Sequence, residues 1–284
     1  MEHAPRLSEI ADRYDAILCD VWGVIRDGRT LLPEAIEALR RYRANHGPVV
    51  LISNSPQPAP RVAAQLASMG APDDAWDDIV TSGDTTLAAI RELGRGPVFH
   101  IGPPGYDDAL FEFAALDFAP LDDAAYVVCT GLRFDRRDEH PDDYRDMLAA
   151  MKARGLPMVC ANPDIVVQWG DDLLWCAGAL ARLYREMGGE TVISGKPHSP
   201  IYELAFEVLA EAGHHLDRSR VLAIGDGPET DLIGAERNGL DGFFVAGGIL
   251  GGDLDLDTFD PEAVRPALEE YGTRCRWAAA HLKW

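Results

Sequence analysis

Polar side chains that could take part in chemistry follow four short apolar runs of this sequence. The runs and the residues after them are 17–19 with Asp20, 49–52 with Ser53 and Asn54, 191–193 with Lys196, and 221–224 with Asp226 and Asp231. Apolar runs of this length are typical of buried strands. A doubly wound parallel sheet binds its ligands beyond the carboxyl ends of its strands. The sequence therefore predicts that these side chains meet at one edge of a sheet.

These residue types form the set that phosphoryl transfer through an aspartyl-phosphate requires. One carboxylate attacks phosphorus, and a hydroxyl, backbone N–H groups and a lysine hold and neutralise the transferring oxygens. Mg²⁺, held by one or two carboxylates, lets the anionic nucleophile approach an anionic substrate. Lys196 and the metal are the expected sources of positive charge.

The overall charge makes that local positive charge necessary. The 284 residues include 47 Asp and Glu against 26 Lys and Arg, which gives a net charge of −21. Such a field disfavours nucleic acid and anionic membranes as partners. No apolar run approaches the ~20 residues that span a bilayer, and residues 1–15 do not resemble a signal peptide. Five scattered cysteines indicate buried thiols in a reducing compartment, so we expect a cytoplasmic protein.

Strands and helices alternate along most of the chain. Around the four polar clusters we expect a further strand at 242–245 and helices near 33–42, 62–69, 200–212 and 230–238. In the middle, strands at 98–101, 126–129 and 158–161 and helices near 142–154 and 175–187 repeat the pattern. This alternation predicts parallel sheets with right-handed crossovers. The C-terminal segment 274–284 is predicted to be part of an amphipathic helix.

With four motifs in this order, the sequence resembles the haloacid dehalogenase superfamily of phosphatases. It is most similar to the class IIA branch, which carries an α/β cap between the second and third motifs. The resemblance extends from Tyr14 to about Ile249 and includes the segments 161–164, 230–235 and 238–239. It implies a Rossmann-like α/β core with a doubly wound parallel sheet, formed by residues 1–82 and 190–284. Residues 83–189 would form the inserted cap.

The resemblance also implies a role for each residue of the site. The substrate would be a small phosphorylated metabolite, and a homodimer formed through the cap is expected at the family level. The implied roles are Asp20 as nucleophile and Mg²⁺ ligand, the backbone carbonyl of Trp22 and Asp226 as further Mg²⁺ ligands, Asp231 as support of the metal shell, Ser53, Asn54 and Lys196 as phosphate-binding residues, and Asn162 and Asp164 as members of a cap loop that faces the substrate.

Trp22 departs from the family pattern. Most phosphatases of this superfamily have Asp two residues after the nucleophile, where it protonates the leaving group. General acid–base help of this kind is typically worth ~10²–10⁴-fold. Asp27, in the following loop, is one candidate for a substitute acid. The alternative function is a catalytically impaired module that binds metal and phosphate for regulation. The metal-independent dehalogenases also have an aromatic residue here, but Asp226 and Asp231 argue against that reading.

Overall fold

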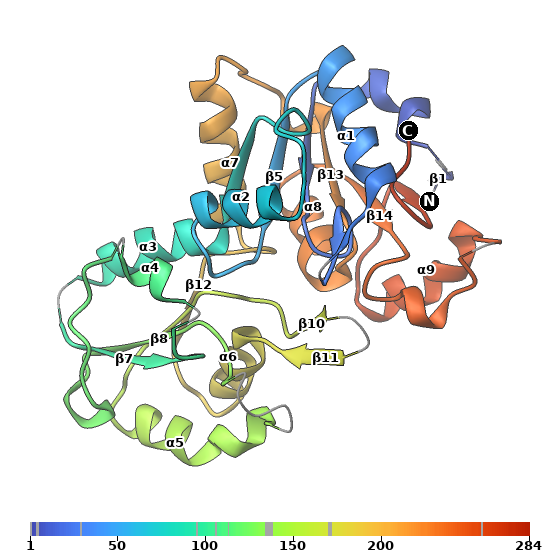
Figure 1. Ribbon diagram of the computed structural model, residues 1–284. Coiled ribbons are helices and arrows are strands. Elements are labelled where there is room, and N and C mark those ends of the chain that lie inside the picture. The colour runs from blue at the N-terminus through green and yellow to red at the C-terminus, as the bar shows by residue number, and fades with distance from the viewer. Residues whose placement is uncertain are drawn as a thin grey trace.

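The computed structural model describes residues 2–3, 6–28, 30–94, 96–105, 107–112, 114–133, 139–169, 172–256 and 258–284. Two parallel sheets, each flanked by helices, lie one above the other in the view of Figure 1. This arrangement confirms the predicted α/β class with a doubly wound parallel core and an additional α/β part. None of the helices in this part of the chain has both the length and the apolar character that crossing a bilayer requires.

The larger sheet has seven strands, and all of its pairings are parallel. Their spatial order is β1 (Glu2–His3), β15 (Trp277–Ala279), β14 (Asp241–Val245), β13 (Val221–Gly225), β2 (Ala16–Cys19), β5 (Val49–Ser53) and β6 (Asp78–Thr81). The chain order reverses between β13 and β2, so the sheet has a switch point beside β2. In open α/β sheets, the crevice at such a point is where ligands bind.

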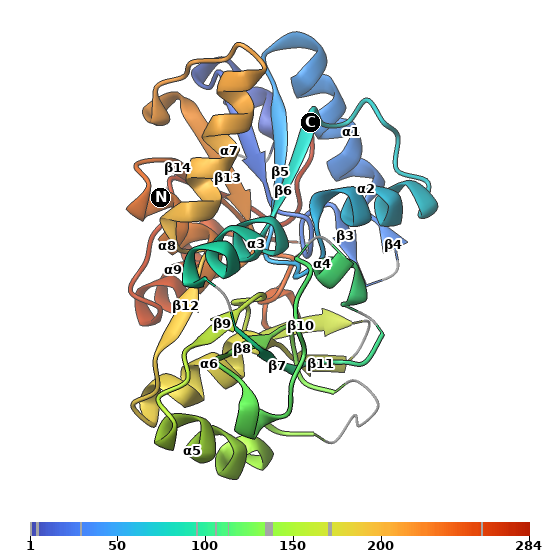
Figure 2. The same cartoon turned by 90° about the vertical axis from the view of Figure 1, so that its left-hand side faces the viewer.

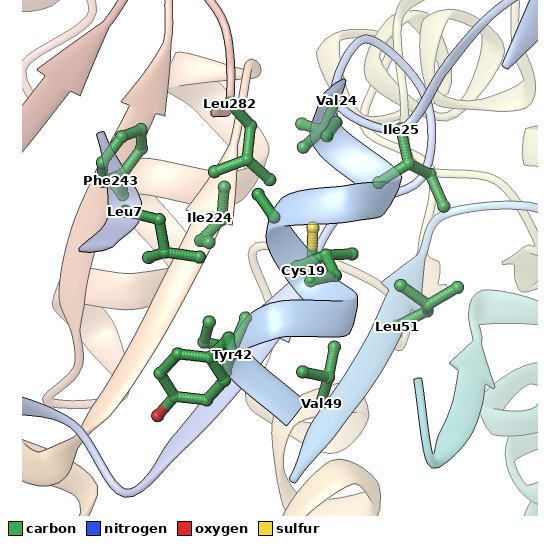
Figure 3. Packing of buried hydrophobic residues seen from close by; sticks show 14 of the residues in the cluster. Leu7, Cys19, Val24, Ile25, Tyr42, Val49, Leu51, Ile224, Phe243 and Leu282 are labelled. Atoms are coloured by element: carbon green, nitrogen blue, oxygen red, sulfur yellow. The ribbon is translucent and has the colours of Figure 1, made fainter. Parts of the chain in front are cut away.

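Alternate side chains of the central strands point to opposite faces of the sheet, and each face packs against a different set of helices. Ile17 and Cys19 of β2 pack toward α1 (Pro33–Asn45) and α2 (Ala59–Ser68), whereas Leu18 packs toward α7 (Ser199–Glu211). Figure 3 shows the first of these layers, with Tyr42 of α1 over the strands. The remaining helices, α8 (Ile233–Arg237) and α9 (Pro261–Glu270), also lie on the second face. Burial of both faces explains why these strands are apolar throughout.

Helix α1 illustrates how the sequence determines this packing. Pro33 occupies its first turn, where proline is favoured because that N–H has no intrahelical partner. Ile36, Leu39 and Tyr42 follow at helical spacing and are buried against the sheet. Truncation of a fully buried leucine such as Leu39 to alanine typically costs about 2–5 kcal/mol. The buried face of this helix therefore holds α1 firmly against the sheet.

The smaller sheet has four parallel strands in the order β12 (Thr191–Ile193), β9 (Met158–Cys160), β8 (Tyr126–Cys129) and β7 (Val98–Ile101). Helices α5 (Arg145–Ala153) and α6 (Ala177–Glu186) cover one face. Helix α3 (Ser82–Leu93) contributes Ala89 and Ile90 to the other face and also contacts α7 of the larger part. In Figure 2, α3 lies between the two sheets. An antiparallel hairpin of β10 (Val166–Trp169) and β11 (Asp172–Trp175) extends beside α6 in Figure 1. Phe111 of α4 (Asp108–Glu112) contacts His100 of β7 with ring centroids 4.7 Å apart.

Three predicted elements differ from the structure. The strand at 191–193 was expected in the core, but β12 pairs with β9 in the smaller sheet. The C-terminal segment was predicted to be helical, but Trp277–Ala279 form strand β15 of the larger sheet. The helix expected near 230–238 begins as a π-helical turn over Pro228–Leu232, and α8 follows it. The five cysteines are free and buried, as predicted.

Candidate active site

Three of the predicted residues lie at the carboxyl ends of neighbouring strands. Asp20 follows β2, Ser53 ends β5 and Asp226 follows β13, and β2 pairs directly with both other strands. The backbone N–H of Asp20 donates to the carbonyl of Ile224, at a distance of 2.8 Å. The predicted meeting of these side chains at one edge of the sheet therefore occurs.

Lys196 completes the site from the chain that follows β12. Its Nζ lies 2.6 Å from Asp20 Oδ1 and 2.7 Å from Asp231 Oδ1, and only 2% of the residue is exposed. Burial alone would lower the pKa of this lysine, but the carboxylates of Asp20, Asp231 and Asp164 outweigh burial and raise the pKa well above its usual range. Lys196 is therefore a permanent positive charge beside Asp20.

Asn54 fixes Lys196 to the end of β5. Its Oδ1 accepts a hydrogen bond from the backbone N–H of Lys196 at 2.8 Å, and its Nδ2 donates to the carbonyl oxygen of Lys196 at 3.1 Å. The same Nδ2 donates to Asp164 Oδ1 at 2.8 Å. Gly195 is required here, since a Cβ at this position would lie 2.7 Å from Asn54 Oδ1. One amide therefore joins the second motif, the third motif and the loop after β9.

Asp20, Asp226 and Asp231 form a cluster that fits a divalent cation. Each offers a carboxylate oxygen, and these three atoms all lie within 4.8 Å of one another. Burial, reinforced by the Asp231 carboxylate, raises the pKa of Asp226 to about 7. The three carboxylates carry more negative charge than the nearby Lys196 can neutralise. Oxygen ligands and uncompensated negative charge are the conditions that Mg²⁺ prefers.

Backbone groups orient two of these carboxylates. Asp226 Oδ2 accepts from the N–H of Ile249 at 2.7 Å, and Asp231 Oδ2 accepts from the N–H of Gly227 at 3.0 Å. Asp231 lies in the π-helical turn Pro228–Leu232. Single π turns are frequent at functional sites, and this one directs the Asp231 carboxylate back toward Lys196. Backbone partners of this kind hold candidate ligands in place.

Gly248 gives a direct test of the metal assignment. A Cβ there would lie 2.1 Å from Asp226 Oδ2, so Gly248→Ala should displace this carboxylate. We expect Mg²⁺ affinity to fall by ~10–100-fold, as is typical when the support of a metal ligand is lost. Gly252→Ala is the matched control, because a Cβ there meets nothing within 4 Å. Equal Mg²⁺ affinity of the two variants in calorimetry would argue against a metal at Asp226.

Trp22 and Asp27 lie on the loop that follows β2. The guanidinium carbon of Arg26 lies 4.2 Å from the centre of the Trp22 ring, and β3 (Arg26–Asp27) pairs with β4 (Thr30–Leu31) in a short hairpin. Both Trp22 and Asp27 line the cavity over the site, and the Asp27 residue is exposed. The position two residues after Asp20 therefore presents an indole and no acid.

Nearly all the predicted site residues line one cavity of about 630 Å³. Its lining includes Asp20, Trp22, Asp27, Ser53, Asn54, Asp164, Lys196, Asp226 and Asp231. Asn162 lies instead on a neighbouring cavity of about 260 Å³, which shares Trp22, Asp164 and Val167 with the first. Asp107 and Thr130 also line the smaller cavity and were not predicted. Thr130 directly follows strand β8, so the strand-end pattern could have pointed to it.

Comparison with known proteins agrees with this geometry. Residues 17–115 match the family model of haloacid dehalogenase-like hydrolases, and residues 193–271 match a second model of HAD-like hydrolases. The crystal structure of a hydrolase of the haloacid dehalogenase-like family from Brucella suis 1330 is similar, with 43% identity and a TM-score of 0.86. That match covers 98% of this chain and 99% of the other.

Two curated bacterial proteins are similar at lower identity. The 5'-nucleotidase YutF of Bacillus subtilis is 27% identical over 238 residues, which are 83% of this chain and 88% of that protein. The acid sugar phosphatase of Staphylococcus epidermidis is 27% identical over 240 residues, again 83% of this chain and 88% of that protein. The chain belongs to the haloacid dehalogenase-like family, and the predicted class IIA phosphatase branch is confirmed.

Proposed function

We propose that this protein is a Mg²⁺-dependent phosphatase that hydrolyses a small phosphomonoester through an aspartyl-phosphate on Asp20. The observation that carries the proposal is the pairing of Asp20 with the buried Lys196, beside Asp226 and Asp231. A site that only bound phosphate would not need a carboxylate nucleophile placed against the expected metal. Mg²⁺, when bound, supplies the positive charge that lets this carboxylate meet an anionic substrate.

In this proposal one side chain of the site attacks phosphorus and the others bind the phosphoryl group. Asp20 forms a bond to phosphorus while the bond from phosphorus to the leaving oxygen breaks. Its contact with Asp20 supports the proposal that Lys196 neutralises the phosphoryl oxygens beside the nucleophile. Ser53 is 1% exposed, and its Oγ accepts a hydrogen bond from the N–H of Ser55 at 3.2 Å, which leaves its own proton for a phosphoryl oxygen. The phosphate-binding role proposed for Asn54 is to hold the Lys196 backbone in place.

Substrate size and class are proposed from the cavity and from the relatives. A volume of about 630 Å³ suits a small metabolite. The names of the relatives, a 5'-nucleotidase and an acid sugar phosphatase, support a nucleotide or sugar phosphate as the substrate class. We propose that the part built on the smaller sheet acts as the cap over the leaving group. Since β12 belongs to this sheet, its C-terminal boundary would lie after Ile193 rather than at residue 189.

Trp22 supports a second candidate, a binding module with little turnover. An indole in the position of the usual acid removes a catalytic group while leaving the metal and phosphate residues intact. Release of phosphate from p-nitrophenyl phosphate with added Mg²⁺ separates the two functions, because nitrophenolate leaves without an acid. Turnover supports the phosphatase. Binding of inorganic phosphate without any turnover would support the module.

Asp226→Asn should weaken Mg²⁺ binding and phosphatase activity together. The change removes one carboxylate ligand and its charge at once. We expect loss of the calorimetric Mg²⁺ signal and of p-nitrophenyl phosphate hydrolysis at low Mg²⁺, with part of the activity regained at high Mg²⁺. Asp73→Asn, at an exposed turn, is the control. Unchanged Mg²⁺ affinity in Asp226→Asn would remove Asp226 from the ligand set.

A further inference from the structure

The proposed reaction needs an acid on the side of the phosphoryl group opposite Asp20. In phosphoryl transfer the attacking and leaving oxygens lie roughly in line with phosphorus. Asp20 attacks from the strand ends of the larger sheet, so the leaving oxygen must face the segments that close the cavity from the smaller sheet. Those segments contribute Asp164, Val166 and Val167 to the lining. Asp164 is the ionisable group among them.

Asp164 is held in a defined place relative to the nucleophile. Asn54 Nδ2 donates to Asp164 Oδ1 at 2.8 Å, and the same amide binds the backbone of Lys196, whose Nζ contacts Asp20. The backbone N–H of Asp164 also donates to Asn162 Oδ1 at 3.1 Å. This series of contacts ties the loop after β9 to the phosphate-binding loops of the larger part.

Asp164 also lies where the two cavities meet. The larger cavity holds the phosphate-binding residues, and the smaller one, of about 260 Å³, is bounded by Trp22, Asn162 and Leu174. Asp164, Trp22 and Val167 line both. A phosphomonoester with its phosphoryl group in the larger cavity and its leaving group in the smaller one would pass its bridging oxygen beside these three residues. Asp164 is the one of the three that can donate a proton.

The carboxyl group of Asp164 is suited to proton transfer. Oδ1 is anchored by Asn54, whereas no residue that the structure describes donates a hydrogen bond to Oδ2. Burial raises the pKa of Asp164, while Lys196 and Asn54 oppose the rise and Asp231 adds to it. The titratable groups that interact with it are Lys196, Asp231, Asp226, Cys160 and Cys176. An anchored carboxyl group with one open oxygen can keep a proton and deliver it.

We propose that Asp164 is the general acid and base of this enzyme, in the role that Trp22 cannot fill. This inference rests on the proposed phosphatase function. Asp164 gives its proton to the leaving oxygen as the bond from that oxygen to phosphorus breaks. The resulting carboxylate then takes a proton from the water that attacks phosphorus on the same side. The bond from phosphorus to Asp20 breaks, which releases phosphate and restores both aspartates.

Asp27 is the rival acid, and the structure favours it less. Its residue is exposed on the short hairpin, and no hydrogen bond from a described residue orients its carboxylate. A general acid must be within hydrogen-bond reach of the leaving oxygen. Asp164 has a fixed partner at the boundary of the two cavities, whereas Asp27 has none in the described part of the chain.

Asp164→Asn tests the proposal with two substrates of nearly equal shape. The asparagine can still accept the hydrogen bond from Asn54 but cannot transfer a proton. With Mg²⁺, single-turnover release of phenol from phenyl phosphate should fall by ~10²–10⁴-fold. Release of nitrophenolate from p-nitrophenyl phosphate should fall much less and appear as a burst before slow turnover, because only the later attack of water lacks its base.

Controls separate this outcome from misfolding and from failure of the proposed function. Asp164→Glu should recover part of the phenol release, and Asp146→Asn, exposed on α5, should behave as wild type. We expect phenol release by the wild type to fall as the pH rises through the pKa of Asp164, because the acid is then deprotonated, and this dependence should be absent from Asp164→Asn. Wild-type phenol release in a folded Asp164→Asn, or the selective loss in Asp27→Asn instead, would overturn the inference. Absence of nitrophenolate release from the wild type would contradict the phosphatase itself.

Discussion

Asp20→Asn should abolish hydrolysis of p-nitrophenyl phosphate and of phenyl phosphate alike. An amide cannot form the phosphoryl-enzyme, so the loss should not depend on the leaving group. Removal of the covalent nucleophile of a serine protease lowers kcat by ~10⁶-fold, and we expect a loss of several orders of magnitude here. Steady-state assays with saturating Mg²⁺ measure this loss, and thermal unfolding shows whether the variant is folded.

The pattern across variants separates nucleophile from acid. Asp20→Asn should show no burst with either substrate, while Asp164→Asn should keep the nitrophenolate burst. Asp73→Asn, on the surface, should retain full activity. Wild-type rates in Asp20→Asn would remove the nucleophile assignment and the phosphoryl-enzyme with it.

Lys196→Met should destabilise the protein and weaken its binding of inorganic phosphate. The change leaves Asp20 and Asp231 buried without the ammonium that lies 2.6 and 2.7 Å from them. Breaking a buried ion pair by removal of one partner typically costs about 3–5 kcal/mol. We therefore expect a clearly lower unfolding temperature in the absence of metal, together with loss of activity.

The effect of Mg²⁺ on the unfolding temperature of Lys196→Met tests this prediction specifically. Since the cation would neutralise the same carboxylates, it should raise the unfolding temperature of Lys196→Met more than that of the wild type. Lys152→Met, exposed near the end of α5, is the control and should respond to Mg²⁺ like the wild type. An equal Mg²⁺ effect on Lys196→Met and wild type would show that lysine and metal do not share these carboxylates.

The part of the site at the centre of the larger sheet could be predicted from sequence. There, each buried strand appears as an apolar run, and the functional residue follows directly at the end of that run. The apolar runs before Asp20, Ser53 and Asp226 are buried on both faces of the sheet, so the polar groups that follow them lie at the edge of the sheet, where they line the cavity. Parallel pairing then brings the three ends together. The alternation of strands and helices already predicts that pairing.

Sheet membership could not be predicted in the same way. Residues 191–193 read as a strand, but their local sequence does not say which sheet they join, and they pair with β9. Trp277–Ala279 is too short an apolar run for periodicity to separate strand from helix. Its pairing with β14, a tertiary contact, makes this segment a strand.

The family resemblance implied that Asp164 belongs to a cap loop facing the substrate, but it gave no sign of the acid role that we propose for this residue. Asp164 lies 110 residues from Asn54 in the chain, and only the fold brings them to 2.8 Å. The sequence showed that the position of Trp22 lacks an acid, but it offered Asp27 because that residue is nearby in the chain. Local sequence cannot show that Asp164 and Asn54 meet, because the two residues belong to different parts of the fold.

Acid quench of a single turnover with p-nitrophenyl phosphate and Mg²⁺ tests the central claim most directly. Peptide mass spectrometry of the quenched protein should find one phosphoryl group, labile to hydroxylamine, on Asp20, in step with the nitrophenolate burst. The label should be absent from Asp20→Asn. A nitrophenolate burst with no phosphoryl group on the protein, or with the group on another residue, would contradict the account.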